Sequence, residues 1–241
     1  MSSSPWEQDM RMSRPERDAN KAHVALTLVL DVSGSMSFSS NGGEAPIDLL
    51  NNSINEMVSE MNKDSRLNTI VDLSIFTFGD EGKRNPHMGF MSIVDVANDI
   101  GKIRLEANDG STHITNVLRE AVEFTRERAN SYRTAYKPWV VIITDGAFHD
   151  NDGELNDVGR IMRQRAQEGK QNFFGFGVPG FNRQQLEKFC EPNEASVRVV
   201  DIKDADNLPK LFAWIGRSMK KVSGTDPTQQ AGIENPNTIF V

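Results

Sequence analysis

The chain has 241 residues, of which 37% are hydrophobic and 25% charged, and its formal net charge at pH 7 is -7. This length and composition predict one large soluble domain and exclude a mostly disordered chain. The acidic balance argues against a general nucleic-acid binder, because binding to phosphates needs clustered Lys and Arg side chains.

The first part of the chain reads as an arm followed by a strand, a helix and a pair of strands. Residues 1–21 are polar and interrupted by prolines, so we expect a flexible arm. Residues 23–30 (HVALTLVL) predict a strand buried on both faces, and apolar residues at helical spacing over 47–61 predict a helix. Strands are expected at 69–79 and 89–96, with a connecting loop short enough for an antiparallel edge pair.

The rest of the chain alternates helices with strands. Helices are predicted at 114–125, 154–168, 183–190 and 208–222. Strands are predicted at 138–144, 171–177 and 196–200. The alternation indicates an α/β fold with a doubly wound, mostly parallel central sheet, one antiparallel edge strand and helices on both faces. We expect this domain to span 22–222 and to be followed by a mobile tail over 223–241.

Two features bear on the compartment of the protein. Cys190 is the single cysteine, so no intrachain disulfide can form, and a reducing cytoplasm is the simplest setting. The first twenty residues hold no signal-peptide core, and nowhere do about eighteen apolar residues follow one another. We therefore expect a cytoplasmic protein that does not span a membrane.

Polar residues gather where the predicted strands end. The first strand runs into Asp31-Val-Ser-Gly-Ser-Met, which places a carboxylate and the hydroxyls of Ser33 and Ser35 at alternate positions of a tight turn. A later strand runs into Asp145, and the run DGST that ends at Thr112 is expected to open a helix. In an open parallel sheet these carboxyl ends flank the binding crevice, at the point where the strand order reverses.

This set of side chains is suited to a hard metal ion. Two carboxylates and three hydroxyls offer oxygen atoms alone, which favours Mg²⁺, Ca²⁺ or Mn²⁺ over zinc or copper. Mg²⁺ is the first choice, because it keeps several waters and needs few direct protein ligands. One coordination position would then stay open for an outside ligand.

The same residues carry a family resemblance. DVSGSM, the threonine at 112 and the TDG run at 144–146 resemble the metal-ion-dependent adhesion site of von Willebrand factor A domains, and the likeness extends over about 22–222. By that resemblance Ser33, Ser35 and Thr112 would contact the metal directly, and Asp31 and Asp145 would hold it mainly through waters. An Asp or Glu of a protein partner would complete the coordination shell.

Within this family the chain is similar to bacterial TerY-like proteins, which are linked to tellurite resistance and chemical stress. The ending LFAWIGRSMKKVS and the lack of other cysteines carry this likeness. It implies the binding member of a signalling set that includes a protein kinase and a PP2C-like phosphatase. Together with the family likeness, the sequence predicts a non-enzymatic interaction module, and the acidic charge and the lack of long apolar runs predict no nucleic-acid and no membrane partner.

Other interpretations stay open at this stage. The Asp31 turn alone is also what a capped helix start looks like. A magnesium phosphohydrolase would also place an Asp after the first strand, but it needs a second Asp where Ser33 stands and a nearby basic residue. A structural subunit with a merely stabilising metal is the third alternative.

Several residues near the motifs have two interpretations. The acidic run of Asp150, Asp152, Glu154 and Asp157 is expected to decorate a helix N-terminus, the alternative being a second cation site. His113 and His149 are expected at the rim, and Cys190 is expected to be a buried apolar residue. Glu234 in the tail offers a carboxylate of the chain itself to the metal site.

Overall fold

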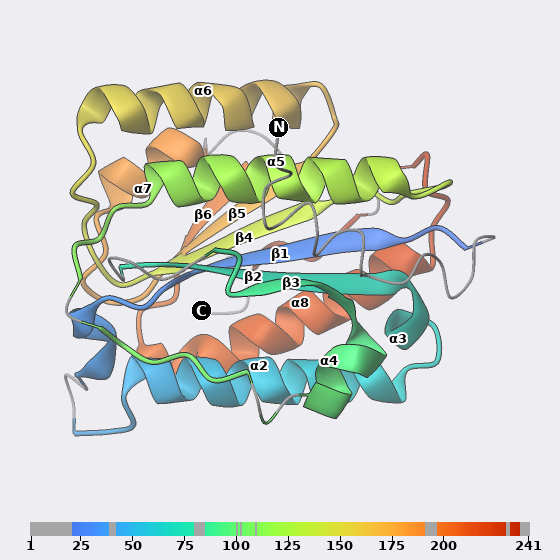
Figure 1. Ribbon diagram of the computed structural model, residues 1–241, viewed down its shortest axis with the longest axis horizontal. Helices are drawn as coiled ribbons and strands as arrows, with labels where there is room; N and C mark the ends of the chain where they lie inside the picture. Colours follow the sequence, from blue (N-terminus) through green and yellow to red (C-terminus); the bar gives the residue numbers. More distant parts are fainter. Residues whose placement is uncertain are drawn as a thin grey trace, which may run out of the picture.

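A computed structural model describes residues 21–38, 42–79, 85–99, 101, 103–108, 110–190, 197–229 and 232–236. They form one six-stranded sheet with the order β3-β2-β1-β4-β5-β6 (Figure 1). The strands are β1 (Val24–Asp31), β2 (Val71–Phe78), β3 (Met88–Ser92), β4 (Trp139–Thr144), β5 (Asn172–Gly177) and β6 (Val197–Asp201). All neighbours are parallel except β2 and β3, so the predicted fold class and antiparallel edge strand are confirmed.

The central strand β1 explains why the site lies where it does. It pairs with β2 on one side and with β4 on the other, so the chain extends the sheet outward from β1 in both directions. Such a reversal of strand order separates the loops that follow the two strands and leaves a crevice between them. The residues that follow β1 and β4 therefore share one edge of the sheet, at the left of Figure 1.

Helices cover both faces of the sheet (Figure 1). One face carries α2 (Pro46–Lys63), α3 (Leu67–Ile70), α4 (Ile93–Asp99) and α8 (Leu208–Ser223). The opposite face carries α5 (Thr115–Ser131), α6 (Asp152–Gln167) and α7 (Arg183–Phe189). Two short 3-10 helices, η1 (Gly34–Ser37) and η3 (Ala205–Asn207), complete the described elements.

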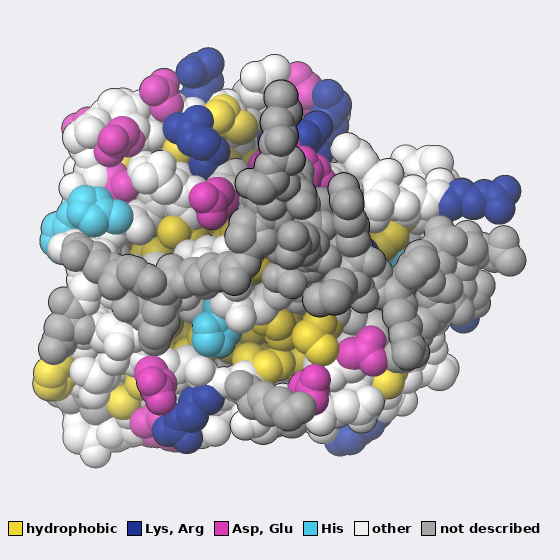
Figure 2. All heavy atoms as spheres, in the orientation of Figure 1, with side chains coloured by type: hydrophobic (Ala, Val, Ile, Leu, Met, Phe, Trp, Pro, Cys, Tyr) yellow, Lys and Arg dark blue, Asp and Glu magenta, His cyan; other side chains and the backbone are white. Residues whose placement is uncertain are grey.

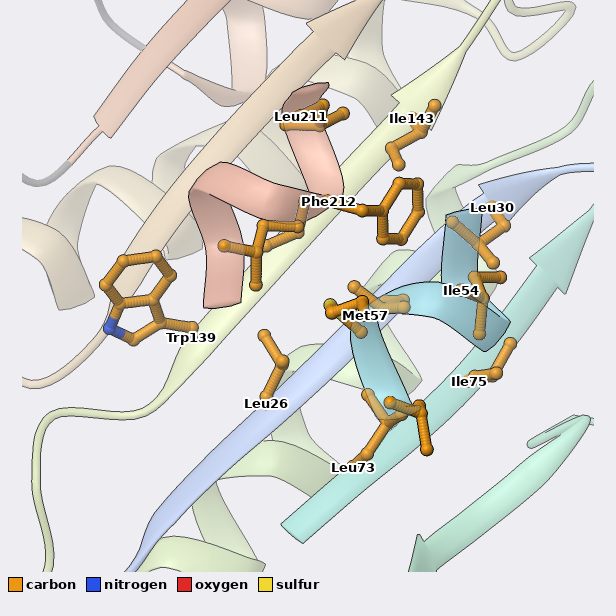
Figure 3. Packing of buried hydrophobic residues seen from close by; sticks show 14 of the residues in the cluster. Leu26, Leu30, Ile54, Met57, Leu73, Ile75, Trp139, Ile143, Leu211 and Phe212 are labelled. Carbon is orange, nitrogen blue, oxygen red and sulfur yellow. The ribbon is translucent and has the colours of Figure 1, made fainter. Parts of the chain in front are cut away.

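The core follows from strands that are apolar on both faces. Every residue of β1 and β4 is buried, as expected for parallel strands between two helix layers. Leu26 and Leu30 of β1 point toward α2 and α8, where they lie among Met57 and Phe212 (Figure 3). This packing holds the ends of β1 and β4 rigidly and so supports the loops beyond them.

The structure corrects two expectations about element boundaries. The strand expected at 89–96 ends at Ser92, and its second half forms α4 instead. Ile93 and Val96 are both fully buried at a spacing of three, and the Ser92 hydroxyl accepts a bond from the Asp95 amide at 3.3 Å, as at a helix start. Thr112 does not open a helix but lies in the loop before α5, which begins at Thr115.

The described part of the tail lies against the domain. The Tyr136 hydroxyl donates to the carbonyl oxygens of Ser223 and Thr225, at 3.1 and 3.2 Å. The Trp214 indole donates to the Glu234 carbonyl at 3.1 Å, and Ile233 packs partly against the core. The arm at 1–20 and the last five residues lie outside the described ranges. No helix in the described ranges is long and apolar enough to cross a membrane.

Candidate metal centre

The Asp31 carboxylate ties the ends of β1 and β4 together. Its Oδ1 accepts a bond from the Ser33 amide at 2.9 Å, and its Oδ2 accepts one from the Thr144 hydroxyl at 2.7 Å. Asp31 is fully buried, so these bonds replace the water that the carboxylate would otherwise bind. The side chain is thereby fixed at the carboxyl edge of the sheet.

The two serines connect this carboxylate to the second one. The hydroxyls of Ser33 and Ser35 lie 3.1 Å apart, and the Ser35 hydroxyl donates to Asp145 Oδ1 at 2.8 Å. Neither hydroxyl caps η1, because Ser33 precedes that helix without a side-chain bond to its amides. Helix capping therefore does not account for the two serines. The structure brings together Asp31, Ser33, Ser35 and Asp145.

Both carboxylates carry unfavourable charge. Burial raises the pKa of Asp31, against hydrogen bonds from Ser33 and Thr144 that lower it. Burial and, next, the charge of Asp31 raise the pKa of Asp145 to about 6, against the bond from Ser35. No Lys or Arg of the described ranges is among the groups that act on either pKa. Two negative charges thus share a partly dry site without a cation from the described residues to offset them.

Thr112 reaches the same edge through its loop. Its amide donates to Nδ1 of His149 at 3.0 Å, and the His149 amide donates back to the Thr112 carbonyl at 2.9 Å. Earlier in this loop Asn108 pairs with Ser33, with the Asn108 amide donating to the Val32 carbonyl at 2.8 Å. The Thr112 side chain is buried, and its hydroxyl has no bonding partner among the described residues. The loop therefore joins the turns that follow β1 and β4.

Asp150 holds this loop in a way that the sequence reasoning missed. Its carboxylate accepts bonds from the amides of Ile114 and Thr115, at 2.8 and 3.2 Å, and from the Thr115 hydroxyl at 2.5 Å. It therefore caps α5 from the loop after β4, whereas Asp152 and Glu154 lie in the first turn of α6 as expected. The bond spans 36 positions, so no local motif announces it.

Two glycines also support the site and were not singled out from the sequence. Gly79 follows β2 with a φ of 89°, and a Cβ there would lie 2.6 Å from the Ser33 amide nitrogen. Gly180 follows β5 with a φ of 109°, and its Cβ would lie 2.7 Å from the Asp145 carbonyl oxygen. Residues other than glycine rarely adopt a positive φ, so the backbone conformation of these two loops favours glycine at both positions. Each glycine allows a neighbouring loop to pack directly on a candidate ligand.

The remaining candidates take ordinary roles. His113 and His149 contact each other with ring centroids 5.9 Å apart, and histidines and acids appear at the left edge of Figure 2, where the strands end. Burial raises the pKa of the Cys190 thiol, which disfavours its use as a nucleophile. Glu234 lies 3.7 Å from Arg217, with its backbone bonded to Trp214 of α8. Trp214 packs on Trp139 at the amino end of β4. Because Asp145 follows the other end of this strand, about 20 Å away, the structure does not bring Glu234 to the candidate metal centre.

The donor set fits a hard cation. Apart from two carboxylates it consists of hydroxyls, each with lone pairs free beyond its present bonds. A bound divalent ion would offset the repulsion that raises the pKa of Asp145, and oxygen donors match Mg²⁺ or Ca²⁺. Among the described residues no group of three or more His, Cys, Asp or Glu side chains could hold a metal ion. The candidate site differs from such a group because it has only two carboxylates, and its other oxygen donors are hydroxyls.

Comparisons with known proteins agree with this fold. Two solved structures of similar architecture are the PilB minor pilin from Streptococcus sanguinis (TM-score 0.62, 14% identity) and the pilus adhesin SpaC from Lactobacillus rhamnosus GG (TM-score 0.59, 14% identity). They are matched over 85% and 84% of this chain, and over 62% and 31% of their own. Proximal thread matrix protein 1 from the mussel byssus is similar at 17% identity and a TM-score of 0.55, over 82% of this chain and 46% of its own.

At these identities the structural neighbours show the fold alone, and this chain spans less than two thirds of the length of each. A search of curated protein sequences finds no match. The family model for the von Willebrand factor type A domain matches residues 25–214, which is most of the chain and includes both carboxylate loops and Thr112. The chain belongs to the von Willebrand factor type A domain family.

Proposed function

We propose that the protein is a non-enzymatic interaction module that grips a carboxylate of a protein partner through a Mg²⁺ ion. Domains of this family generally mediate metal-dependent protein interactions. The observation that carries the proposal is the pair of buried carboxylates Asp31 and Asp145, linked through two serine hydroxyls, on which no basic residue in the described part of the chain acts.

The candidate ligands would contribute to ion binding in two ways. Ser33, Ser35 and Thr112 would supply hydroxyl oxygens, with Asp31 and Asp145 behind them. When bound, the ion supplies the largest positive charge of the crevice and attracts an acidic side chain. Ca²⁺ and Mn²⁺ have the same preference for oxygen and would serve as substitutes in vitro.

An exposed aromatic side chain extends the surface offered to a partner. Phe38 follows Ser35 by three residues and is 74% exposed, the only large hydrophobic side chain so exposed among the described residues. Aromatic residues are enriched at binding surfaces. The partner segment would therefore present an apolar group beside its Asp or Glu.

A hydrolytic role has less support. A phosphohydrolase of this type needs an Asp at the position of Ser33 and a basic residue to neutralise the phosphate. Ser33 instead bonds to Ser35, and no Lys or Arg that the structure describes acts on the carboxylate of Asp31. We therefore place binding rather than turnover at this site.

The cellular setting follows from the sequence likeness alone. We place the protein in a bacterial, cytoplasmic stress or signalling system of the TerY-like kind, beside a protein kinase and a PP2C-like phosphatase. The partner would be a protein, with neither nucleic acid nor membrane involved. The net charge of -7 supports this, because it disfavours phosphate backbones.

The experiment that tests the proposal is a pull-down of the tagged full-length chain from its native cells. It compares Mg²⁺, EDTA and the variants Asp31→Ala, Thr112→Ala and Ser35→Ala. We expect a set of proteins to be captured with Mg²⁺ and lost in each of the other samples.

The matched control is Ser37→Ala, which removes a hydroxyl of the same 3-10 helix that bonds only to the Gly34 carbonyl among the described residues. This variant should retain every partner. Partners that persist in EDTA and in all three site variants would refute a metal-gated function and leave the ion a structural role.

A further inference from the structure

A large cavity lies at the end of the molecule opposite to the metal centre. Its volume is about 890 Å³, and it is lined by the last turns of α5 and α6, the segment that leads into β4, and the start of the tail. In Figure 1 these helix ends lie together at the right, where the parallel strands begin. The volume falls within the range of small-molecule sites.

The lining of this cavity is basic although the protein is acidic. Four cations and a single carboxylate are among its described lining residues, the cations being Arg126, Lys137, Arg165 and Lys170 and the carboxylate Glu168. The chain as a whole carries a net charge of -7. Arg126 pairs with Glu123 and Lys170 with Glu168, so the excess positive charge at this cavity comes from Lys137 and Arg165.

Two of these cations are poorly neutralised. Lys137 is half-buried and has no hydrogen bond or ion pair with a described residue, and burial lowers its pKa. Arg165 donates to the Gln171 side-chain oxygen at 2.9 Å. Burial and then the charge of Arg126 lower the pKa of Arg165. Glu168 acts in the opposite direction on Arg165, but it forms no ion pair with it, whereas Arg126 pairs with Glu123. Lys137 and Arg165 are therefore the cations of the cavity without an ion pair to a described residue.

The field of the helices does not explain the whole cluster. A helix C-terminus favours nearby cations, which accounts for Arg165 in the last turn of α6 and for Lys170 just beyond it. Arg126 is held by its ion pair with Glu123 of the same helix. Neither reason accounts for Lys137, which precedes β4 and faces the same space.

A buried donor also lacks an acceptor at this site. Trp139 lines the cavity and is fully buried, and its indole nitrogen has no bonding partner among the described residues. Figure 3 shows this nitrogen on the side of the ring away from Met57 and Phe212 of the core. An N–H group buried without an acceptor costs about 1–3 kcal/mol, so a ligand atom or a water it orders is the missing partner.

We propose that this cavity binds a small phosphate-bearing anion of nucleotide size. A compact polyanion matches cations placed around a cavity, whereas a nucleic-acid duplex would need them along an open surface. Asn130, Gln164 and Asn172 line the same space and would supply hydrogen bonds to the remainder of the ligand. The site would work independently of the metal centre.

Calorimetric titration of the full-length protein in EDTA tests this proposal, with inorganic pyrophosphate and ATP as probes. Saturable binding of either probe is expected. The double variant Lys137→Met, Arg165→Gln should weaken that binding at least about tenfold, since each charged contact contributes more than 1 kcal/mol. Equal affinity for both probes would assign the phosphates alone as the recognised group, and tighter ATP binding would assign a nucleotide.

One control tests whether the loss of any surface cation weakens probe binding, and a second tests whether the metal centre contributes to it. Arg160→Gln removes an exposed cation of α6 that pairs with Asp157 at 3.2 Å, and it should leave binding unchanged, as should Asp31→Ala. If both probes fail to bind at millimolar concentration, or if the double variant binds as the wild type does, the proposal is wrong.

Nuclear magnetic resonance provides a test in which the wild-type protein itself is titrated. The indole resonance of Trp139, assigned with Trp139→Phe, should shift on addition of the probe. That of Trp214, which already donates to the Glu234 carbonyl, should shift less. An unmoved Trp139 resonance at saturating probe would overturn the assignment of the cavity.

Discussion

At the scale of single residues, the charge of Asp145 should lower the stability of the metal-free protein and favour the binding of a metal ion. Burial and the neighbouring Asp31 raise its pKa to about 6, so the metal-free protein bears the cost of ionising it near neutral pH. Natural binding sites often keep such repulsion because a ligand removes it. The cost should therefore be visible whenever the ion is absent.

Replacing Asp145 by Asn should stabilise the metal-free protein at pH 7 and abolish its response to Mg²⁺. Asn keeps an acceptor for the Ser35 hydroxyl but removes the charge, and a pKa raised from 3.8 to about 6 corresponds to a gain of about 3 kcal/mol. Urea unfolding in EDTA measures this gain. A variant less stable than the wild type under these conditions would contradict the electrostatic reasoning.

The same pKa predicts how the metal-free protein responds to pH. The folded state binds the Asp145 proton more tightly than the unfolded state does, so the contribution of Asp145 to stability should fall as pH rises from 3.8 to about 6. Above that window its contribution should be constant. Comparing the free energy of unfolding of wild type and Asp145→Asn across this range isolates the effect, and parallel profiles would argue against it.

Gly79 should be indispensable for the geometry of Ser33. Alanine there would require a φ of 89° and would place its Cβ 2.6 Å from a backbone nitrogen that cannot move aside cheaply. Gly169→Ala is the matched control, with a φ of 68° and nothing within 4 Å. Both should lose about 1 kcal/mol from backbone strain, but only Gly79→Ala should also lower the affinity for Mg²⁺. Equal metal affinities in calorimetry would contradict this role.

At the scale of elements, the start of α5 is fixed by a residue outside that helix. Asp150 accepts bonds from Ile114 and Thr115, while its neighbour His149 bonds to Thr112. The loop that carries a candidate metal ligand is thereby attached to the loop after β4. The orientation of Thr112 depends on this attachment as much as on its own sequence.

Asp150→Ala should therefore affect both stability and metal binding. Loss of the cap leaves buried amides of α5 unpaired, which costs about 2 kcal/mol, and a looser loop should weaken Mg²⁺ affinity. Asn151→Ala is the control, because Asn151 caps α6 through the Glu154 amide at 3.0 Å and has no described bond to the Thr112 loop. Thermal unfolding and calorimetry with Mg²⁺ compare the two. Identical metal affinities would show that the cap acts on stability only.

The sequence predicts those elements whose signal is local and strong. The runs that form β1 and β4 are almost entirely apolar, because both faces are covered, and they were predicted to within one residue at either end. The error at 93–96 has a physical cause, since Ile93, Val94 and Val96 are β-branched residues of the kind that favours strands. The i,i+3 spacing and the Ser92–Asp95 pair are the only signs of the helix.

The residues of the candidate site also differ in whether a local sequence pattern reveals them. Asp31, Ser33 and Ser35 stand in one short motif, so the sequence alone could suggest them together. Asp150, Gly79 and Gly180 act on partners in other parts of the chain, and a single sequence holds no pattern that links them. Their roles emerge only when the topology places the loops side by side.

At the scale of the whole molecule, a bound ion should stabilise the fold by mass action. An ion that binds only the folded state, at a concentration about 100-fold above its dissociation constant, adds about 2.7 kcal/mol to the free energy of unfolding. Urea unfolding with Mg²⁺ and with EDTA measures this difference. Thr112→Val, which keeps the shape and the backbone bonds to His149, should lose most of it, and an undiminished difference would remove Thr112 from the ligand set.

The position of β1 at the centre of the sheet has a consequence for synthesis on the ribosome. Asp31 emerges early, but Thr144, which bonds to its carboxylate, emerges more than a hundred residues later, and β4 must dock on β1 before the two meet. A nascent chain that stops short of β4 carries four of the five candidate ligands but lacks Asp145 and the strand that positions Asp31. Acquisition of a metal ion at this site would thus require a chain in which both halves of the sheet have assembled.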